Sequence, residues 1–333
     1  MDLKAVVDYP SLGTNMPLLA VMHGYQGTST NFVASVRHRL ATYYGKVFLL
    51  LVEMRGRGGS EGAKDDSGRE IYDIIDAIDY CITNYPAQID ANQIHIVGYS
   101  GGGGNAFACA AKFPDKFNTI TTFFGMSDYG HDAVDGWYQN ITIDYQALME
   151  AAIGGSPTTT PNNYYARSAV DAITNYSGGY LRMYHDIADG LVKPVHSQRV
   201  ASAMSAAGLS NYMLSISQLT DDPRWIHGYP QLETVGAPCI QAEAQFMPNI
   251  INKTHAAWTI PASGTITVIG YIVTKRFSIW LNSGLDAVAT VVYNTTINTY
   301  TVTPLTGEVI VVITQGTKTA TQTISTETEM VVS

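Results

Sequence analysis

Cysteine, charge and long apolar runs are all scarce in this sequence of 333 residues. Its three cysteines, Cys81, Cys109 and Cys239, do not make a disulfide framework, and the first two fall on predicted helix faces as small core residues. No run approaches the roughly 18 apolar residues that a membrane-spanning helix needs. The longest, from Val47 to Val52, is typical of a buried strand. We therefore expect neither a disulfide-stapled domain nor a membrane-embedded one.

Basic residues are also few: 19 Lys and Arg stand against 28 Asp and Glu, which gives a net charge of −9. Nucleic-acid and anionic membrane surfaces attract basic stripes, so we expect neither as a partner. Charged residues make up only 14% of the chain, while Thr, Asn, Gly and Tyr are abundant, a composition that favours a secreted, virion-exposed or cell-surface protein over a cytoplasmic one. Since residues 1–4 do not begin a signal peptide, we expect either an intracellular protein or one whose leader was removed.

Short apolar runs alternate with longer amphipathic ones over residues 1–255, which predicts a mostly parallel sheet flanked by helices. The expected strands are residues 18–23, 47–53, 94–99, 119–124, 180–184 and 211–217, and the expected helices are residues 28–43, 69–84 and 196–207. The strand pattern breaks between residues 127 and 179, in a stretch rich in Tyr, Gly, Asn and Thr. We interpret this stretch as a cap over the pocket, by analogy with hydrolases.

The last segment, residues 256–333, shows no helical pattern. Thr, Val and Ile alternate in short runs at residues 264–273, 277–281, 288–293, 299–303, 308–314 and 319–325. Six or seven such strands predict a β-sandwich of the immunoglobulin-like kind, as an accessory domain that follows the 1–255 domain.

The most informative motif is Gly98-Tyr99-Ser100-Gly101-Gly102, which follows a predicted strand and opens a helix. Gly-x-Ser-x-Gly in this context predicts a nucleophile elbow, a sharp turn that exposes the serine hydroxyl. The glycines let the strand and the helix approach closely. A serine hydroxyl is a poor nucleophile without a base beside it, so we expect an acid and then a histidine downstream of Ser100.

Two aspartates and one histidine fit these roles by position. Asp186 and Asp189 both follow the predicted strand that ends at Tyr184, at the sheet edge where ligands bind. Asp189 is favoured because a few loop residues are needed to turn a carboxylate toward the histidine, and Asp186 stays open. Among eight histidines, His227 lies in a loop after the last predicted strand, from which a base reaches a serine above the central strand.

The oxyanion of an acyl-transfer reaction needs two N–H donors. We expect one to be the backbone amide of Gly101, at the N-terminus of the elbow helix. The other is expected from the glycine-containing loop after the first predicted strand, with Tyr25 as the favoured donor and its ring as a wall of the acyl pocket. Tyr99 and Trp225 are expected to contact substrate. P-loop, HExxH and EF-hand spacings are missing from the sequence, so we expect no metal and no cofactor.

Several stretches together resemble the prolyl oligopeptidase-like and esterase branch of the α/β-hydrolase superfamily. They are His23-Gly24, Arg55-Gly56-Arg57-Gly58-Gly59-Ser60, the elbow, Gly154-Gly155-Ser156-Pro157 with Tyr164-Tyr165-Ala166-Arg167-Ser168, and Asp189-x-x-Val192. The likeness covers about residues 18–230. It implies Ser100 as nucleophile, Asp189 as acid and His227 as base.

Two departures from the oligopeptidases bear on function. Their large propeller is missing from this sequence, and a C-terminal β-module is present, which resembles the immunoglobulin-like or carbohydrate-binding appendages of polymer-acting enzymes. We therefore expect a serine carboxylic-ester hydrolase for small-molecule or polymeric esters, such as acyl, acetyl or feruloyl esters of polysaccharides, or polyesters. The module would then contact carbohydrate or polymer. The alternatives are a serine peptidase for short peptides and a non-catalytic binding or adhesion protein.

Overall fold

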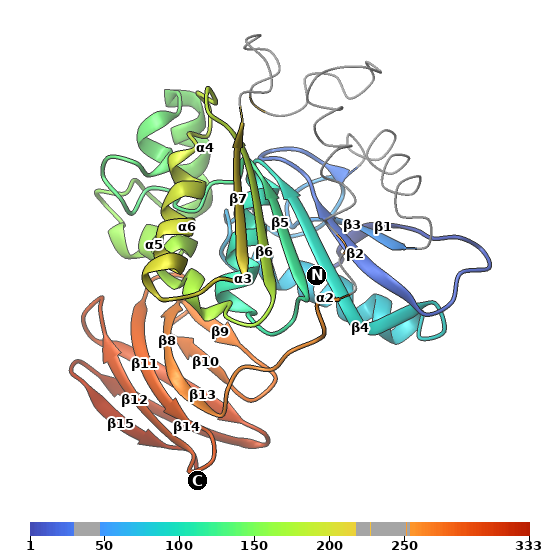
Figure 1. The fold of residues 1–333 in the computed structure, drawn as a ribbon. Coiled ribbons are helices and arrows are strands. Elements are labelled where there is room, and N and C mark those ends of the chain that lie inside the picture. The colour runs from blue at the N-terminus through green and yellow to red at the C-terminus, as the bar shows by residue number, and fades with distance from the viewer. Residues whose placement is uncertain (30–46, 218–226, 228–250, 252–253) are drawn as a thin grey trace.

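The computed structural model describes residues 1–29, 47–217, 227, 251 and 254–333. It contains one seven-stranded sheet and two four-stranded sheets. The first sheet has the order β1-β3-β2-β4-β5-β6-β7 and is parallel except for β1, which confirms the predicted mostly parallel sheet (Figure 1). Its strands are β1 (Lys4–Asp8), β2 (Met16–Met22), β3 (Phe48–Glu53), β4 (Ile89–Tyr99), β5 (Thr119–Phe123), β6 (Tyr180–Asp186) and β7 (Tyr212–Ser217).

Three helices pack into one apolar core with alternate residues of these strands: α2 (Glu70–Asn84), α3 (Gly101–Lys112) and α6 (Val195–Ala206). Helix α2 buries Ile71, Ile74, Ile75 and Ile78, a spacing that keeps all four on one face. Each such side chain stabilises the fold by about 1.5–3 kcal/mol. The helix predicted at residues 28–43 lies, from residue 30 on, outside the described residues.

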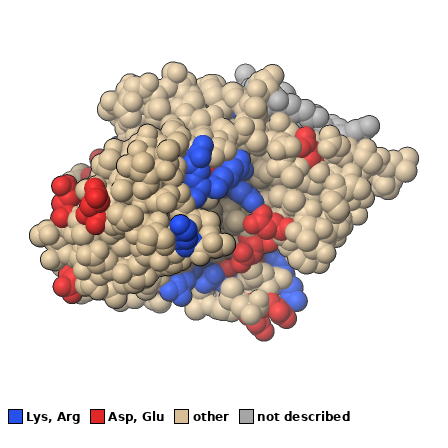
Figure 2. Space-filling model, turned by 90° about the horizontal axis from the view of Figure 1, so that it is seen from below, with Lys and Arg blue, Asp and Glu red and all other residues tan. Residues whose placement is uncertain are grey.

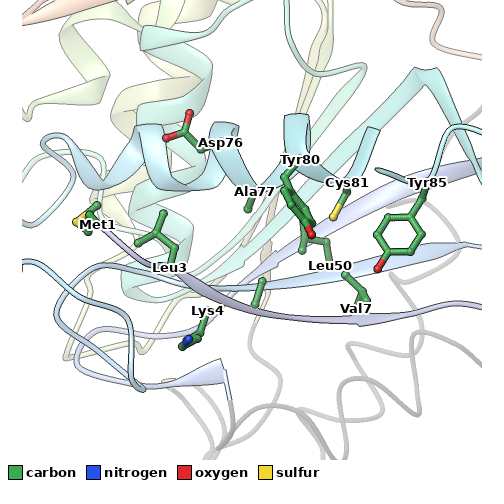
Figure 3. Close-up of a pocket in the computed structure, with 11 residues that line it drawn as sticks. Met1, Leu3, Lys4, Val7, Leu50, Asp76, Ala77, Tyr80, Cys81 and Tyr85 are labelled. Carbon is green, nitrogen blue, oxygen red and sulfur yellow. The ribbon is translucent and has the colours of Figure 1, made fainter. Parts of the chain in front are cut away.

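The edge strand β1, which the sequence did not predict, pairs antiparallel with β3. Between it, β3 and α2 lies a cavity of about 510 Å³ (Figure 3). Leu3 and Val7 line it from the strand side, and Tyr80 and Cys81 line it from the helix. None of the site residues predicted above lines this cavity.

No strand interrupts the segment between β5 and β6, which carries η1 (Trp137–Asn140), α4 (Ile143–Ile153), α5 (Pro161–Tyr165) and η2 (Ala169–Asn175). Its two halves differ in position. Helix α4 lies near the end of the sheet at which β7 ends (Figure 1). In contrast, η2 lies beside α3. Ile173 and Tyr176 join the main core, while Trp137 and Met149 form a separate cluster. The second half of this segment therefore belongs to the core rather than to a cap.

Eight strands follow in two antiparallel sheets, of order β14-β13-β10-β9 and β15-β12-β11-β8. They are β8 (Ser263–Ile269), β9 (Tyr271–Val273), β10 (Ser278–Leu281), β11 (Val288–Asn294), β12 (Thr299–Pro304), β13 (Val309–Gln315), β14 (Lys318–Ile324) and β15 (Thr328–Val331). The run predicted as one strand at residues 264–273 is two, because Gly270 has φ +77° and turns the chain from one sheet to the other. Strand β15 was not predicted.

The C-terminal sheets share a buried interface with the first part of the chain. Tyr271 packs 4.9 Å from the ring of Tyr72 on α2, and its hydroxyl donates to the carbonyl of Gly68 at 3.0 Å. Lys112, at the end of α3, is 0% exposed, donates to the carbonyl of Ile269 and lies 4.3 Å from the centre of the Tyr271 ring. Burial, together with the charge of Arg167, lowers the pKa of Lys112 to about 7. Among the helices described here, none has the length and apolarity to cross a bilayer.

Candidate active site

Ser100 occupies the turn between β4 and α3 and has φ +54° and ψ −118°, a left-handed φ that is rare outside glycine. The backbone fixes this turn, since the amide of Ser100 donates to the carbonyl of Phe123 and its carbonyl accepts from the amide of Gly104, each at 3.0 Å. A Cβ on Gly98 would lie 1.9 Å from the carbonyl oxygen of Gly102. Strand and helix meet so closely that only glycine fits, which is the geometry predicted for a nucleophile elbow.

The structure brings the three residues predicted for catalysis into one line of hydrogen bonds. The Oγ of Ser100 lies 2.9 Å from Nε2 of His227, and Nδ1 of His227 lies 2.7 Å from Oδ2 of Asp189. With Nδ1 donating to the carboxylate, Nε2 is free to accept the serine proton. Both contacts lie within the range needed for proton transfer and for orienting a base.

Asp189 is held as an anion in the loop after β6. Its Oδ1 accepts the amides of Leu191 and Val192, both at 3.0 Å. Burial raises its pKa, but hydrogen bonds from His185 and His227 outweigh burial and leave the pKa below its ordinary value. The alternative acid, Asp186, accepts the amide of Ala188 at 2.8 Å and so caps the turn. Of the two aspartates that the sequence left open, Asp189 is the one bonded to His227.

The two residues whose backbone amides are predicted for the oxyanion lie in segments that touch. A Cβ built on Gly101 would stand 2.5 Å from the amide nitrogen of Tyr25, so the loop after β2 touches the start of α3. A Cβ on Gly24 would lie 3.7 Å from Cβ of Ser100. The hydroxyl of Tyr25 donates to Oδ2 of Asp66 at 2.7 Å. The side chain of Tyr25 is thus bonded to Asp66, while its amide nitrogen adjoins Gly101, the residue after the nucleophile.

Of the two residues predicted to contact substrate, Tyr99 and Trp225, the structure describes only Tyr99. Tyr99 is 1% exposed, and its ring stacks on that of Phe123 with centroids 4.9 Å apart. The structure therefore gives it a packing role, because the residue before the elbow serine still follows the strand alternation and faces the core. Trp225 lies outside the described residues.

Comparison with known proteins identifies the family. The model of the prolyl oligopeptidase family matches residues 49–221, just over half of the chain. The chain belongs to the prolyl oligopeptidase family. Among curated proteins, the chain is similar to the "uncharacterized peptidase YtmA" of Bacillus subtilis, 26% identical over 143 residues, which are 43% of this chain and 52% of that protein. Feruloyl esterase B of Neurospora crassa is 23% identical over 191 residues, 55% of this chain and 62% of that protein. The matches thus span between half and two thirds of these relatives.

Solved structures similar to this prolyl oligopeptidase family member fall in both activity classes. The acylaminoacyl peptidase of Pyrococcus horikoshii has a TM-score of 0.57 at 16% identity, over 76% of this chain and 40% of that one. An acetyl ester-xyloside bifunctional hydrolase from Caldicellulosiruptor lactoaceticus has a TM-score of 0.55 at 16% identity, over 76% of this chain and 90% of that one. At these identities the likeness shows the α/β-hydrolase fold alone. The relatives of this family member thus include both an esterase and a peptidase by name, and both are distant.

One residue of the site was missed by the sequence analysis of this family member. His185, the sixth residue of β6, donates from Nε2 to the carbonyl of Val192 at 2.7 Å and accepts at Nδ1 from the hydroxyl of Ser197 at 2.9 Å. The same Nε2 lies 3.5 Å from Oδ2 of Asp189. His185 therefore ties both ends of the acid loop together. The sequence feature that could have indicated His185 is its position near the end of a strand, four residues before the acid Asp189.

Proposed function

We propose that this chain is a serine carboxylesterase in which Ser100 is the nucleophile, His227 the base and Asp189 the acid that orients the base. The observation that carries the proposal is the line of hydrogen bonds from Asp189 through His227 to Ser100. Nε2 of His227 removes the proton of Ser100 Oγ as Oγ bonds to the ester carbonyl carbon. The amides of Tyr25 and Gly101 stabilise the resulting oxyanion.

The second half of the reaction uses the same groups. His227 gives its proton to the departing alcohol, which leaves the acyl group on Ser100. It then takes a proton from water as the water oxygen attacks the acyl carbonyl, and returns that proton to Ser100 Oγ when the carboxylic acid leaves. Asp189 stays ionised throughout and stabilises the imidazolium that forms twice in each cycle.

An ester substrate is supported by one protein from each comparison. Feruloyl esterase B is among the curated relatives, and an acetyl ester-xyloside hydrolase is among the solved structures with the same fold.

The acyl group that fits best is apolar and aromatic. The ring of Tyr25 contacts that of Trp137 edge-on at 4.9 Å and lies 6.0 Å from that of Tyr145. Next to Tyr145, helix α4 leaves Ile143 75% exposed and Leu148 46% exposed. Exposed apolar side chains beside an aromatic cluster suit a planar acyl group such as a feruloyl ester, because flat rings stack on one another.

The alcohol side is proposed to be a polymer, a polysaccharide or a polyester, held in part by the C-terminal sheets. We retain the immunoglobulin-like assignment of these sheets and the division at residue 255 as part of this proposal. Figure 2 shows the face of the molecule on which they lie: large areas carry no charge, and Lys and Arg gather near its middle beside acidic groups. Such a surface suits a neutral polymer better than an ionic one.

A peptidase acting on short peptides is the second candidate, and the acylaminoacyl peptidase and the Bacillus relative favour it. The two candidates share every residue of the proposed triad. A non-catalytic binding protein would have no use for the hydrogen bond between Ser100 and His227.

The first test is hydrolysis of p-nitrophenyl esters, from acetate to octanoate plus an aromatic acyl ester, beside an aminoacyl p-nitroanilide. Ser100→Ala should lower ester turnover at least about a thousandfold. The matched control, Ser177→Ala, changes an exposed serine in the loop before β6 and should leave turnover intact. Anilide cleavage above ester cleavage would replace the esterase with a peptidase, and no turnover with either probe would favour a binding protein.

A further inference from the structure

A buried polar cluster lies directly beneath the proposed oxyanion hole. Its members come from four separate parts of the chain and are all nearly inaccessible to solvent: Arg57, Asp66, Ser67, Glu70, Asn105 and Tyr129. A hollow barely large enough for one water separates part of this cluster from Gly24, Tyr25 and Gly101. The proposed reaction uses none of these six side chains.

Hydrogen bonds from Arg57 to two carboxylates connect the cluster. Arg57 donates from Nη1 to Glu70 at 2.8 Å and approaches Oδ1 of Asp66 from Nη2 at 3.4 Å. The other oxygen of Glu70 accepts the amide of Ser67 at 2.9 Å. The hydroxyl of Ser67 donates to Asn105 on the elbow helix at 2.6 Å. The loop that carries Asp66 is therefore fastened to both α2 and α3.

The backbone at Asp66 is held in an unfavourable conformation. Asp66 and Ser67 have φ +43° and φ +62°, left-handed values in two consecutive residues that are not glycine. Such strain persists only where the surroundings over-determine it, and it is concentrated at functional sites. The consequence is that one carboxylate oxygen of Asp66 faces the hydroxyl of Tyr25 at 2.7 Å.

Tyr25 needs a side-chain anchor because its own loop is permissive. Gly24 and Gly27 flank it in the sequence. The carbonyl oxygen of Gly24 accepts a hydrogen bond from the amide of Gly27 and lies 2.9 Å from Nδ1 of His23. These contacts close the turn at Gly24. The hydrogen bond to Asp66 and the packing on Trp137 then restrain Tyr25 itself, whose amide adjoins Gly101.

We propose that Asp66, held by Arg57, is a positioning residue that fixes the side chain of Tyr25 and thereby aims the Tyr25 amide at the oxyanion. The inference rests on the proposed hydrolase function. It assigns the cluster a role in transition-state stabilisation rather than in substrate binding, because the carboxylate contacts the aromatic wall only at the hydroxyl of Tyr25, whereas the ring itself packs on Trp137. A misaimed amide weakens the oxyanion bond, whereas the acyl-binding side chains stay in place.

The experiment measures kcat and KM separately, with the p-nitrophenyl ester that the wild type hydrolyses fastest in the series proposed above. Tyr25→Phe removes the hydroxyl and keeps the ring. We expect kcat to fall roughly ten- to a hundredfold, which is less than the fall that the loss of a whole oxyanion donor causes, and KM to stay within about twofold of wild type. Asp66→Ala should give the same pattern. Asp66→Asn, which keeps an oxygen acceptor, should recover most of the loss. A boronic-acid transition-state analogue should lose affinity in parallel with kcat.

Tyr138→Phe is the matched control, because the hydroxyl of Tyr138 donates to Glu150, in the segment between β5 and β6, and not to the buried cluster. It should change neither kcat nor KM. The inference is overturned if Tyr25→Phe keeps wild-type kcat, or if KM rises while kcat holds. Tyr25→Phe loses only one hydroxyl, so it remains informative even if Asp66→Ala fails to fold. Absence of all turnover in the wild type, with no labelling of Ser100 by a fluorophosphonate, would instead refute the proposed function itself.

Discussion

The buried amine of Lys112 should make the free energy of unfolding depend on pH. The size of this pH effect can be worked out from the structure. Lys112 is fully buried, and burial lowers its pKa from 10.5 to about 7. In the unfolded chain the amine is exposed and keeps its ordinary pKa. Between pH 7 and pH 10.5 the unfolded chain therefore binds more protons at this position than the folded chain, so the free energy of unfolding rises with pH.

The expected slope is about 1.4 kcal/mol per pH unit, or about 3 kcal/mol between pH 7 and pH 9.5. Other groups also titrate in this range, so the measured quantity is the difference between wild type and Lys112→Met. Methionine fills a similar volume without a titratable group. Urea unfolding of both proteins, followed by tryptophan fluorescence at half-unit pH steps, should show the wild type gaining stability relative to the variant as pH rises.

A difference that is flat from pH 7 to pH 9.5 would refute the reasoning, because it would mean that Lys112 has an ordinary pKa and is solvated. A second control uses Lys116→Met, in the turn that follows α3, where Lys116 pairs with the exposed carboxylate of Asp79. The stability difference for this variant should not change over the same range.

Three further predictions concern the site. Gly101→Ala places a Cβ 2.5 Å from the amide nitrogen of Tyr25, so kcat for the p-nitrophenyl ester should fall at least about a hundredfold while the circular dichroism spectrum stays unchanged. A kcat within about tenfold of wild type would contradict the oxyanion assignment. His185→Phe removes the donor to the carbonyl of Val192 in the acid loop and should lower kcat about tenfold, because Asp189 is then held less firmly against His227; an unchanged kcat would count against that role. Tyr145→Ala should raise KM about tenfold for an aromatic acyl ester and hardly at all for the acetate; equal effects on both would refute the aromatic wall.

Much of the fold follows from sequence where pattern and physical cause coincide. Strands β2 and β3 are almost continuous apolar runs, because a parallel sheet is buried on both faces. The predicted ends of β2 to β7 are correct within two residues except at the start of β4. The start of β4 was missed by five residues, since Asp90, Asn92 and Gln93 are polar. Strand β1 was missed for the same reason, because a partly exposed edge strand has no continuous apolar run.

The candidate site was predictable to the extent that chain order constrains it. The elbow turn, the choice of a histidine downstream and the position of the acid after a strand all follow from how a parallel sheet presents its carboxyl edge. Contacts made by a single side chain did not follow. The bond from Tyr25 to Asp66 joins residues 41 apart through a strained turn that no residue pattern marks, and the inward ring of Tyr99 is a matter of strand register.

Helix α3 connects the site with the C-terminal sheets and limits what those sheets do. Ser100 precedes its first residue, and Lys112, its last, contacts Ile269 and Tyr271. Twelve residues of helix span roughly 18 Å, so the interface lies that far from the nucleophile. Ile269 and Tyr271 belong to the same apolar core as α2 and α3, which makes the C-terminal sheets part of the structure that supports the elbow. Their proposed hold on a polymer therefore acts by raising the local concentration of ester at a distance, and it should change KM for polymeric but not for small esters.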